Sequence, residues 1–202
     1  MMTMTDTMKD SSKKLSWLLR HGAASVGIPI DAAGWVAIGD VLRHLRMTRS
    51  YLDALVADNA KRRYEIEGDR IRACQGHSLG VVGADPAVIE ATWKVFTADA
   101  PIWHGTAIEA LPSIAREGLR PQTRTHVHLA PSLESVVGKR AQVAVMLEVD
   151  PRRVRAEGVT VYEAPNGVIL ARRIPAGAIV GLRPMTARAR ARAAEFAGLF
   201  RG

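Results

Sequence analysis

Apolar residues in the first third of the chain recur every three or four positions, the spacing of one face of an α-helix. Such stretches lie at residues 15–19, 41–45 and 52–56, and Ser11 or Ser12 is expected to cap the first helix. Residues 62–74 instead alternate apolar and polar side chains around a Gly-Asp turn, which predicts two short antiparallel strands. Three helices followed by a hairpin are typical of a winged helix.

The second half of the chain changes to short apolar runs separated by Gly and Pro. Residues 107–118 predict one helix, and five runs predict strands, at residues 102–105, 126–130, 141–149, 159–163 and 167–171. This content indicates a sheet-rich lobe, so the expected fold class is α+β. The arginine-rich end of the chain is expected to be a solvated terminal helix or a frayed end.

The charge balance points to an anionic partner. The chain of 202 residues carries 28 Lys and Arg against 20 Asp and Glu, a net charge of +8. This balance favours RNA, DNA or phosphorylated cofactors, and a generic basic surface is the alternative. Cys74 is the single cysteine, which excludes an internal disulfide and a multi-cysteine metal site. The sequence has neither a secretion signal nor an apolar run of about 20 residues, so a cytoplasmic protein with no membrane partner is expected, with a monomer as the default.

Metal catalysis and phosphate-binding glycine loops are not expected. The six histidines are not accompanied by a cluster of carboxylates. His126 and His128 share one face of a predicted strand, but no Cys or acidic partner is near them in sequence, so a zinc site is not expected. The glycine spacing of a P-loop or a Rossmann motif is absent from the sequence as well. A nucleotide cofactor would have to be bound in another way.

Several short motifs occur together in one order. They are SKKLSWLLRH at residues 12–21, KRRY at 61–64, QGHS at 75–78, HGT at 104–106, RTHVHL at 124–129 and NGV at 166–168. This ordered set resembles the NAD-dependent RNA 2′-phosphotransferase family, best known for tRNA 2′-phosphotransferase, and the resemblance extends from about Ser12 to Pro184. It implies a flexible N-terminus (1–11), a winged-helix RNA-binding lobe (12–80), a linker (81–100), an ADP-ribosyltransferase-like, β-rich NAD-binding lobe (101–185) and a basic C-terminal tail (186–202).

The resemblance also implies a two-step reaction with NAD⁺ as co-substrate and an RNA bearing an internal 2′-phosphate as partner. The 2′-phosphate first attacks the anomeric carbon of the nicotinamide ribose, which releases nicotinamide and forms an RNA-2′-phospho-ADP-ribose intermediate. The neighbouring ribose 2″-hydroxyl then attacks the phosphorus. The products would be RNA with a 2′-hydroxyl and ADP-ribose 1″,2″-cyclic phosphate, within RNA repair or tRNA processing.

The family's catalytic set of three arginines and one histidine matches Arg20, His21, Arg63 and Arg124. Arginine suits this task because its guanidinium stays charged and binds phosphate through two parallel hydrogen bonds, and His21 could act as general acid and base. Each residue taken alone could instead be an ordinary surface charge or a helix-dipole partner.

The remaining site residues carried over from the family bind the cofactor or the RNA. The cofactor set comprises His104, Gly105, Thr106, His128, Asn166, Gly167 and Val168, and further RNA or phosphate contacts are expected from Lys14, Gln75, His77 and Arg140. His77 could equally be a turn histidine with its hydrogen bonds satisfied. Trp17 and Trp35 are expected in the core rather than as stacking platforms for bases.

Four positions in the second half depart from common patterns. Ala130, Ala164 and Ile169 replace the usual serine, serine and tryptophan of the family, which could alter NAD⁺ affinity. Val168 lies where many ADP-ribosyltransferases carry a catalytic glutamate, and a phosphate acceptor, already nucleophilic, does not need one.

Two other functions stay open at this point. One is an ADP-ribosyltransferase that leaves ADP-ribose on a nucleic-acid phosphate. The other is a winged-helix nucleic-acid binder without catalysis, which would show salt-dependent RNA binding and no nicotinamide release.

Overall fold

A computed structural model describes residues 4–139, 142–196 and 198–200. The chain forms two compact units. Unit 1 comprises Met1–Thr92 together with Thr123–Thr125, and unit 2 comprises Trp93–Gln122 and His126–Gly202. Each unit has its own hydrophobic core, so each is described separately.

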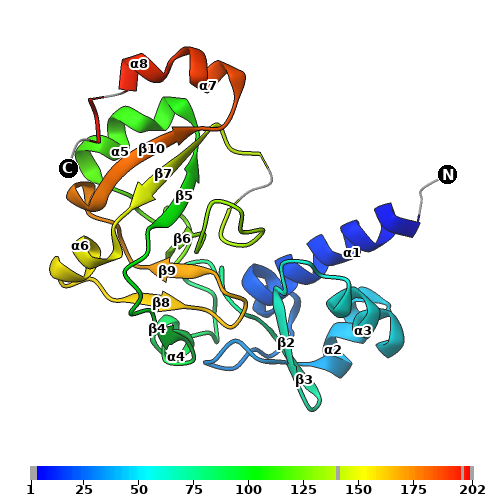
Figure 1. Ribbon diagram of the computed structural model, residues 1–202. Coiled ribbons are helices and arrows are strands. Elements are labelled where there is room, and N and C mark those ends of the chain that lie inside the picture. The colour runs from blue at the N-terminus through cyan, green and yellow to red at the C-terminus, as the bar shows by residue number, and fades with distance from the viewer. Residues whose placement is uncertain (1–3, 140–141, 197, 201–202) are drawn as a thin grey trace. The chain divides into compact units, whose positions relative to one another are not determined.

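Unit 1 is mainly helical, with one small antiparallel sheet in the strand order β1-β3-β2 (Figure 1). Its elements are α1 (Met4–Trp17), the π-helix η1 (Leu18–Gly22), the 3₁₀-helix η2 (Ala24–Val26), β1 (Val36–Ala37), α2 (Ile38–Leu45), α3 (Arg49–Ala57), β2 (Tyr64–Glu67), β3 (Arg70–Ala73) and α4 (Pro86–Glu90). The helices and the hairpin predicted from residue spacing are confirmed.

The predicted cap of the first helix is wrong, because α1 begins at Met4 and both serines lie inside it. Their hydroxyl groups serve another purpose. Tyr51 Oη donates to Ser11 Oγ over 3.2 Å, and Ser12 Oγ lies 3.2 Å from the Tyr64 hydroxyl. Serine in a helix interior often bonds to a nearby group instead of capping. Here the two serine hydroxyls contact tyrosine hydroxyls, and Tyr64 Oη also donates to the Ser12 carbonyl over 2.8 Å.

The core of unit 1 is built on the leucines of the first helical segment. Leu15, Leu18 and Leu19 are fully buried and pack with apolar residues of α2, α3 and the sheet. Trp17 was expected to join them, and that expectation is wrong: 48% of its surface is exposed. Trp35 is half-buried beneath two arginine side chains, with Arg72 4.5 Å from its ring centroid.

Unit 2 contains two antiparallel sheets, in the orders β10-β7-β5 and β4-β8-β9-β6. Its elements are β4 (Lys94–Val95), β5 (Ile102–Thr106), the 3₁₀-helix η3 (Ile108–Ala110), α5 (Leu111–Glu117), β6 (Val127–Leu129), β7 (Val145–Val149), α6 (Pro151–Ala156), β8 (Val161–Glu163), β9 (Ile169–Ala171), the 3₁₀-helix η4 (Ala176–Ala178), β10 (Ile179–Pro184), α7 (Ala187–Ala191) and α8 (Ala193–Phe196). Helices and small antiparallel sheets in one chain confirm the α+β class.

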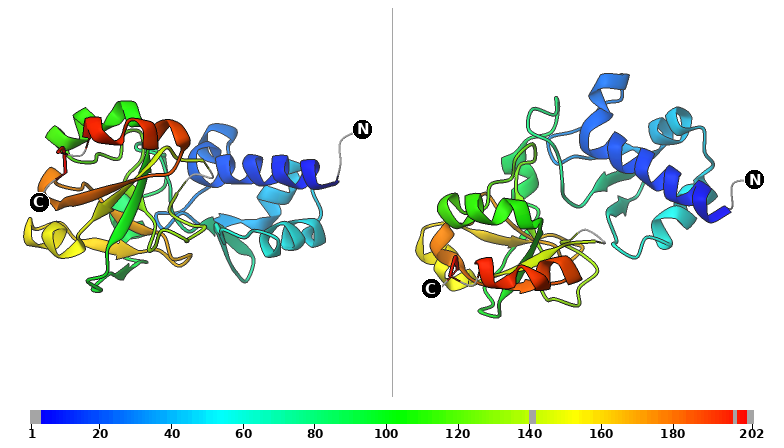
Figure 2. Two further views of the ribbon diagram at one scale, coloured as in Figure 1. Left: turned by 45° about the horizontal axis from the view of Figure 1, so that its top comes forward. Right: turned by 90° about the horizontal axis from the view of Figure 1, so that it is seen from above.

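The C-terminal segment is more than a solvated tail. Helix α7 packs beside strand β10 (Figure 2), and Ala189, Phe196 and Phe200 are buried in the core of unit 2. Arg188 and Arg192 remain on the outside, where they pair with Glu109 and Glu195. These arginines therefore lie on the outer side of the segment, opposite the apolar side that packs into the core of unit 2. No helix in the described ranges is long and apolar enough to cross a membrane.

Candidate functional site

A π-helix places two of the predicted catalytic residues. Residues Leu18–Gly22 form one turn of π-helix, and the N–H of Ala23 donates to the Leu18 carbonyl over 3.0 Å. Single π-helical turns are frequent at functional sites. Arg20 and His21 are the third and fourth residues of this turn. Gly22 closes it, since a Cβ there would lie 2.4 Å from the Trp17 ring.

The segment 75–78 runs alongside this turn. Ser78 contacts both residues: its N–H donates to the Arg20 carbonyl over 3.3 Å, and its Oγ lies 2.7 Å from His21 Nδ1. Gly76 lies under the Arg20 guanidinium, and a Cβ there would be 3.2 Å from Arg20 Nε at a φ of +91°. A residue other than glycine would be strained at that φ and would press on the guanidinium.

Arg124 reaches unit 1 through a three-residue segment of the second half of the chain. Ser78 and Arg124 form an antiparallel β-bridge. On either side of it, Leu79 N–H donates to the Thr123 carbonyl over 3.2 Å, and Thr125 N–H to the His77 carbonyl over 3.3 Å. Main-chain hydrogen bonds therefore attach this segment to the loop that contacts Arg20 and His21.

Arg63, the fourth predicted catalytic residue, directly precedes strand β2. Its Nη1 donates to Asn59 Oδ1 over 3.3 Å, and this hydrogen bond orients the guanidinium. All four predicted catalytic residues therefore belong to unit 1.

Positive charges lie close together in this cluster. Burial, with smaller contributions from the charges of Arg124 and Arg63, lowers the pKa of Arg20 to about 10. Arg20 Nε is buried and has no hydrogen-bond partner within the described part of the chain. Burial, Arg20 and Arg124 also lower the pKa of His21. Like charges held together around a buried donor are unfavourable until an anion neutralises them. We refer to Arg20, His21, Arg63 and Arg124 as the arginine cluster.

The residues given a lesser RNA-binding role are distributed differently. Lys14 is exposed in the last turn of α1, whereas the side chains of Gln75 and His77 are buried. Burial, followed by the charge of Arg20, lowers the pKa of His77 to about 4, so this ring is neutral at neutral pH. Its Nε2 has no hydrogen-bond partner among the described residues and faces Gly34. Arg140 lies outside the described residues.

The predicted cofactor residues of strands β5 and β6 belong to unit 2. His104 Nδ1 lies 2.9 Å from the carbonyl oxygen of His128, so Nδ1 carries the proton and donates. In the neutral ring, Nε2 is then an acceptor that suits a ribose hydroxyl. A Cβ at Gly105 would lie 2.5 Å from Val143 Cγ1, so packing within unit 2 already requires glycine there. Thr106 ends β5 opposite Val145.

Asn166, Gly167 and Val168 form the tight turn between β8 and β9. Ala164 N–H donates to the Val168 carbonyl over 2.9 Å, and Gly167 N–H to the Ala164 carbonyl over 2.8 Å. Gly167 has a φ of +78°, as expected for glycine in an Asn-Gly hairpin turn. Asn166 and Val168 are buried. The turn geometry thus explains the Asn-Gly pair without a ligand, and it also brings these residues next to strand β9.

Two of the residues that depart from the family pattern, Ala130 and Ile169, are buried in unit 2. Ala130 exchanges two main-chain hydrogen bonds with Trp103, over 2.9 and 2.7 Å, and Ile169 is fully buried in the core of unit 2. His126 is buried as well, 4.9 Å from the ring centroid of Trp93 in an edge-to-face contact. Within the described ranges, no group of three His, Cys, Asp or Glu side chains could hold a metal ion.

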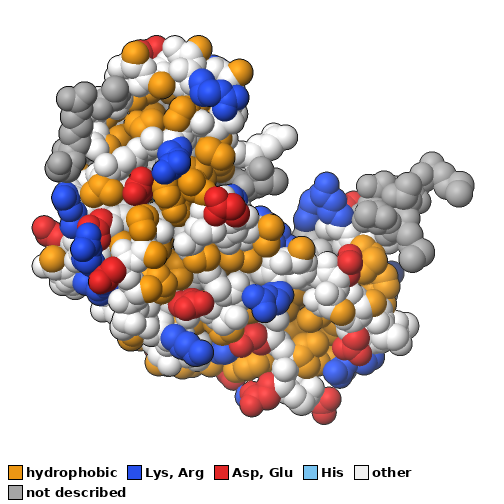
Figure 3. All heavy atoms as spheres, in the orientation of Figure 1, with side chains coloured by type: hydrophobic (Ala, Val, Ile, Leu, Met, Phe, Trp, Pro, Cys, Tyr) orange, Lys and Arg blue, Asp and Glu red, His pale blue; other side chains and the backbone are white. Residues whose placement is uncertain are grey.

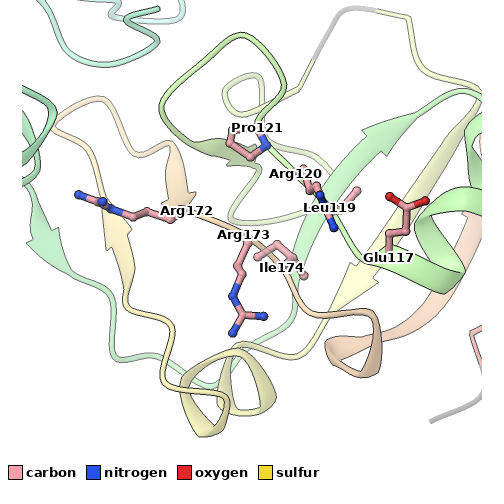
Figure 4. Close-up of a pocket in the computed structure, with 7 residues that line it drawn as sticks. All are labelled: Glu117, Leu119, Arg120, Pro121, Arg172, Arg173 and Ile174. Atoms are coloured by element: carbon pink, nitrogen blue, oxygen red, sulfur yellow. The ribbon is translucent and has the colours of Figure 1, made fainter. Parts of the chain in front are cut away.

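Unit 2 also contains a cavity of about 340 Å³ (Figure 4). It is lined by Glu117, Leu119, Arg120, Pro121, Arg172, Arg173 and Ile174. Figure 4 shows the side chains of Arg172 and Arg173 pointing apart, and Arg173 Nη2 donates to the Glu157 carbonyl over 3.5 Å. The predicted cofactor residues in the described part of unit 2 do not line this cavity.

Net charge alone does not locate a nucleic-acid surface. On the face drawn in Figure 3, Lys and Arg side chains are interspersed with Asp and Glu. The local positive charge of the arginine cluster is therefore a better guide to a nucleic-acid surface than the net charge of the chain.

Comparison with known proteins assigns the family. The model of the RNA 2′-phosphotransferase, Tpt1/KptA family matches residues 6–173. The chain belongs to this family. A relative from Burkholderia lata is 37% identical over 82% of this chain and 86% of its own length. Relatives from Pseudomonas aeruginosa PAO1 and Streptomyces coelicolor are 38% identical, over 84% and 81% of this chain and 94% and 90% of their own lengths. All three carry the name "Probable RNA 2′-phosphotransferase".

For this RNA 2′-phosphotransferase family member, sequence reasoning missed two contacts. Ser78 closes the QGHS motif but was not singled out, although it is the residue that contacts both Arg20 and His21. Its position directly after a candidate histidine was the available signal. Asn59, which holds Arg63, lies in an unremarkable stretch of sequence, and nothing there marks it as a partner.

Proposed function

We propose that this chain is an NAD⁺-dependent RNA 2′-phosphotransferase that removes an internal 2′-phosphate from RNA. The observation that carries the proposal is the arginine cluster, in which the Nε of Arg20 is buried without a partner among the described residues and the charges of Arg63 and Arg124 repel that of Arg20. A phosphate dianion would relieve that repulsion and bind the guanidinium groups through charge-assisted hydrogen bonds. Membership of the family supports the same substrate.

In the proposed first step, the arginine cluster holds the 2′-phosphate while one of its oxygens attacks the anomeric carbon of the nicotinamide ribose of NAD⁺. The new bond joins that oxygen to carbon, and nicotinamide leaves with the electrons of the glycosidic bond. A phosphate oxygen needs no general base, which agrees with an apolar, buried Val168 in place of a glutamate. The product is RNA-2′-phospho-ADP-ribose.

In the proposed second step, the ribose 2″-hydroxyl attacks the phosphorus and the bond from phosphorus to the RNA 2′-oxygen breaks. His21 takes the hydroxyl proton and returns a proton to the leaving 2′-oxygen. Its lowered pKa leaves the free ring neutral near pH 7 and able to accept that proton. The contact of Nδ1 with Ser78 Oγ fixes the ring orientation. The arginines stabilise charge that grows on the phosphate oxygens.

NAD⁺ is proposed to bind through residues of unit 2. His104 fits a ribose hydroxyl because its Nδ1–H is already used by the His128 carbonyl, which leaves Nε2 as an acceptor in the neutral ring. The products would be RNA with a 2′-hydroxyl, nicotinamide and ADP-ribose 1″,2″-cyclic phosphate.

The finer fold assignment is part of the same proposal. Helices α1 to α3 followed by the β2–β3 hairpin support a winged-helix identity for unit 1. The two antiparallel sheets of unit 2, with His104 on β5 and the β8–β9 turn, support an ADP-ribosyltransferase-like identity for that unit.

The test incubates the purified protein with a short RNA bearing one internal 2′-phosphate, with and without NAD⁺. Nicotinamide, phosphate loss and ADP-ribose cyclic phosphate are followed together. Conversion that requires NAD⁺ and gives all three products is expected. A persistent RNA–ADP-ribose adduct would instead indicate a transferase that stops after the first step, and RNA binding without nicotinamide release would indicate a binding protein.

Variants of the arginine cluster test the assignment of roles. Arg63→Ala and Arg124→Ala should each slow phosphate removal through the second step, and the adduct should build up once that step becomes slower than its formation. Mass spectrometry of the RNA would detect it. Wild-type rates in both variants would remove these arginines from the site.

A further inference from the structure

Trp17 is a large aromatic side chain that unit 1 leaves on its surface. It is the last residue of α1, and 48% of its surface is exposed, in contrast to the fully buried Leu15 and Leu18 on either side. The indole is nonetheless held in place. Its six-membered ring lies over Gly22, where a Cβ would come within 2.4 Å of ring carbons. The protein therefore fixes the ring through backbone contact and leaves much of its surface open.

The position of this ring links it to the arginine cluster. Trp17 directly precedes the π-helical turn that carries Arg20 and His21, which follow it by three and four residues. One helical turn is about 5.4 Å long. Lys13 and Lys14 lie one turn earlier and are exposed. The exposed indole thus lies along the chain between two exposed lysines and two residues of the arginine cluster, Arg20 and His21.

Aromatic side chains next to basic groups are typical of single-stranded nucleic-acid sites, because every base has a face that can stack. Fixed aromatic rings lose little conformational entropy when they bind. We propose that Trp17 stacks on a nucleobase of the substrate RNA, one that adjoins the 2′-phosphate held by the arginine cluster. This inference rests on the proposed function and adds a base-contacting subsite to it. Stacking makes no use of the base edge, so the subsite should accept any of the four bases.

The test compares two RNA substrates that carry the same internal 2′-phosphate. One has ordinary bases, and the other has abasic riboses at the phosphorylated nucleotide and its two neighbours. Trp17→Ala should raise the KM of the first substrate by about 5- to 100-fold, the loss usual for a stacking aromatic. It should change the KM of the abasic substrate less than twofold and leave kcat of both nearly unchanged. Trp17→Phe and Trp17→Tyr should restore most of the affinity.

A control variant and the effect on kcat separate stacking from support of the fold. Val88→Ala removes another exposed apolar side chain from unit 1, 38% exposed on α4, and should leave both KM values unchanged. If Trp17 only supported the turn that carries Arg20 and His21, Trp17→Ala would lower kcat on both substrates equally, and the proposal would fail. It would also fail if the variant raised KM for NAD⁺ instead, since the base stacked would then be that of the co-substrate.

A binding measurement keeps the inference separate from the proposed reaction. Both RNAs are titrated without NAD⁺, and the tryptophan fluorescence of the wild type is compared with that of Trp17→Phe. Quenching of Trp17 by the base-containing RNA alone is expected. If the protein removes no phosphate but this difference remains, the reaction is wrong and the stacking is right. Equal affinity of wild type and Trp17→Ala for the base-containing RNA would overturn the stacking whatever the reaction.

Discussion

Replacing Arg20 with methionine should stabilise the protein while it destroys activity. The pKa of Arg20 falls from an ordinary 12.5 to about 10, chiefly through burial and then through repulsion by Arg124 and Arg63. A difference of that size corresponds to about 3 kcal/mol of unfavourable free energy for the charged side chain at neutral pH. Methionine keeps an apolar stem of similar length, and it removes both the charge and the unpartnered Nε–H. We expect the free energy of unfolding to rise by about 1–3 kcal/mol.

The assay is urea denaturation at pH 7 followed by tryptophan fluorescence and circular dichroism. The buffer should contain no phosphate, because an anion that binds the folded protein would stabilise the wild type and mask the effect. Phosphate removal from RNA is measured in parallel and should fall by about 10²- to 10³-fold or more. Higher stability combined with lower activity is the signature of a residue kept for function.

Arg72 provides the matched control, since it is also a buried arginine but is fully partnered. Its Nε donates to Glu65 Oε2 over 2.7 Å, and its guanidinium stacks on Trp35. Arg72→Met should destabilise the protein by about 3 kcal/mol or more, because Glu65 loses its partner. If Arg20→Met destabilised the protein as much as Arg72→Met does, the repulsion inferred for the arginine cluster would be refuted.

Three further predictions follow from the pKa shifts and the cofactor geometry. His77 has a pKa of about 4 in the folded protein and an ordinary value of 6.5, so the unfolded chain takes up the His77 proton first as the pH falls. The free energy of unfolding should therefore drop by up to about 3 kcal/mol between pH 6.5 and 4. In denaturation experiments, His77→Gln should abolish this pH dependence. The pKa of His21, lowered by burial and by Arg20 and Arg124, should rise when a phosphate monoester binds, and an NMR titration that shows no upward movement would argue against its place in the site. His104→Ala should raise the KM for NAD⁺ more than that for RNA, and equal losses would indicate misfolding.

Much of the secondary structure could be predicted because apolar spacing records which faces are buried. The leucines of the first helix, the Tyr64 hairpin and the apolar runs of unit 2 all appear where the pattern placed them. Thr48 caps α3 as its position suggests, its side chain accepting from the Tyr51 N–H. The α+β class followed from these elements without any knowledge of the site.

Two of the errors share one cause, which is that partners distant in sequence decide where a side chain lies. Ser12 looked like a helix cap because its partner Tyr64 is 52 residues away. Phe196 looked like part of a solvated tail because the apolar surface it covers belongs to other strands of unit 2. Trp17 is the exception: it was expected in the core from its helical position, but its ring packs over Gly22, only five residues away, and 48% of its surface stays exposed. The candidate site was predicted from motif order, whereas the contacts of Ser78 and Asn59 are visible only in the structure.

The short segment Thr123–Thr125 has a consequence for any attempt to divide the protein. The polypeptide leaves unit 1 at residue 92, returns for three residues, and leaves again at residue 125. A fragment that stops at Thr92 would retain Arg20, His21 and Arg63 and would lack Arg124 together with its pairing to Ser78. A single crossover at Thr92 would therefore take residue 124 from a different parent than Arg20, His21 and Arg63. Recombination and gene fusion should therefore take both units from the same parent protein.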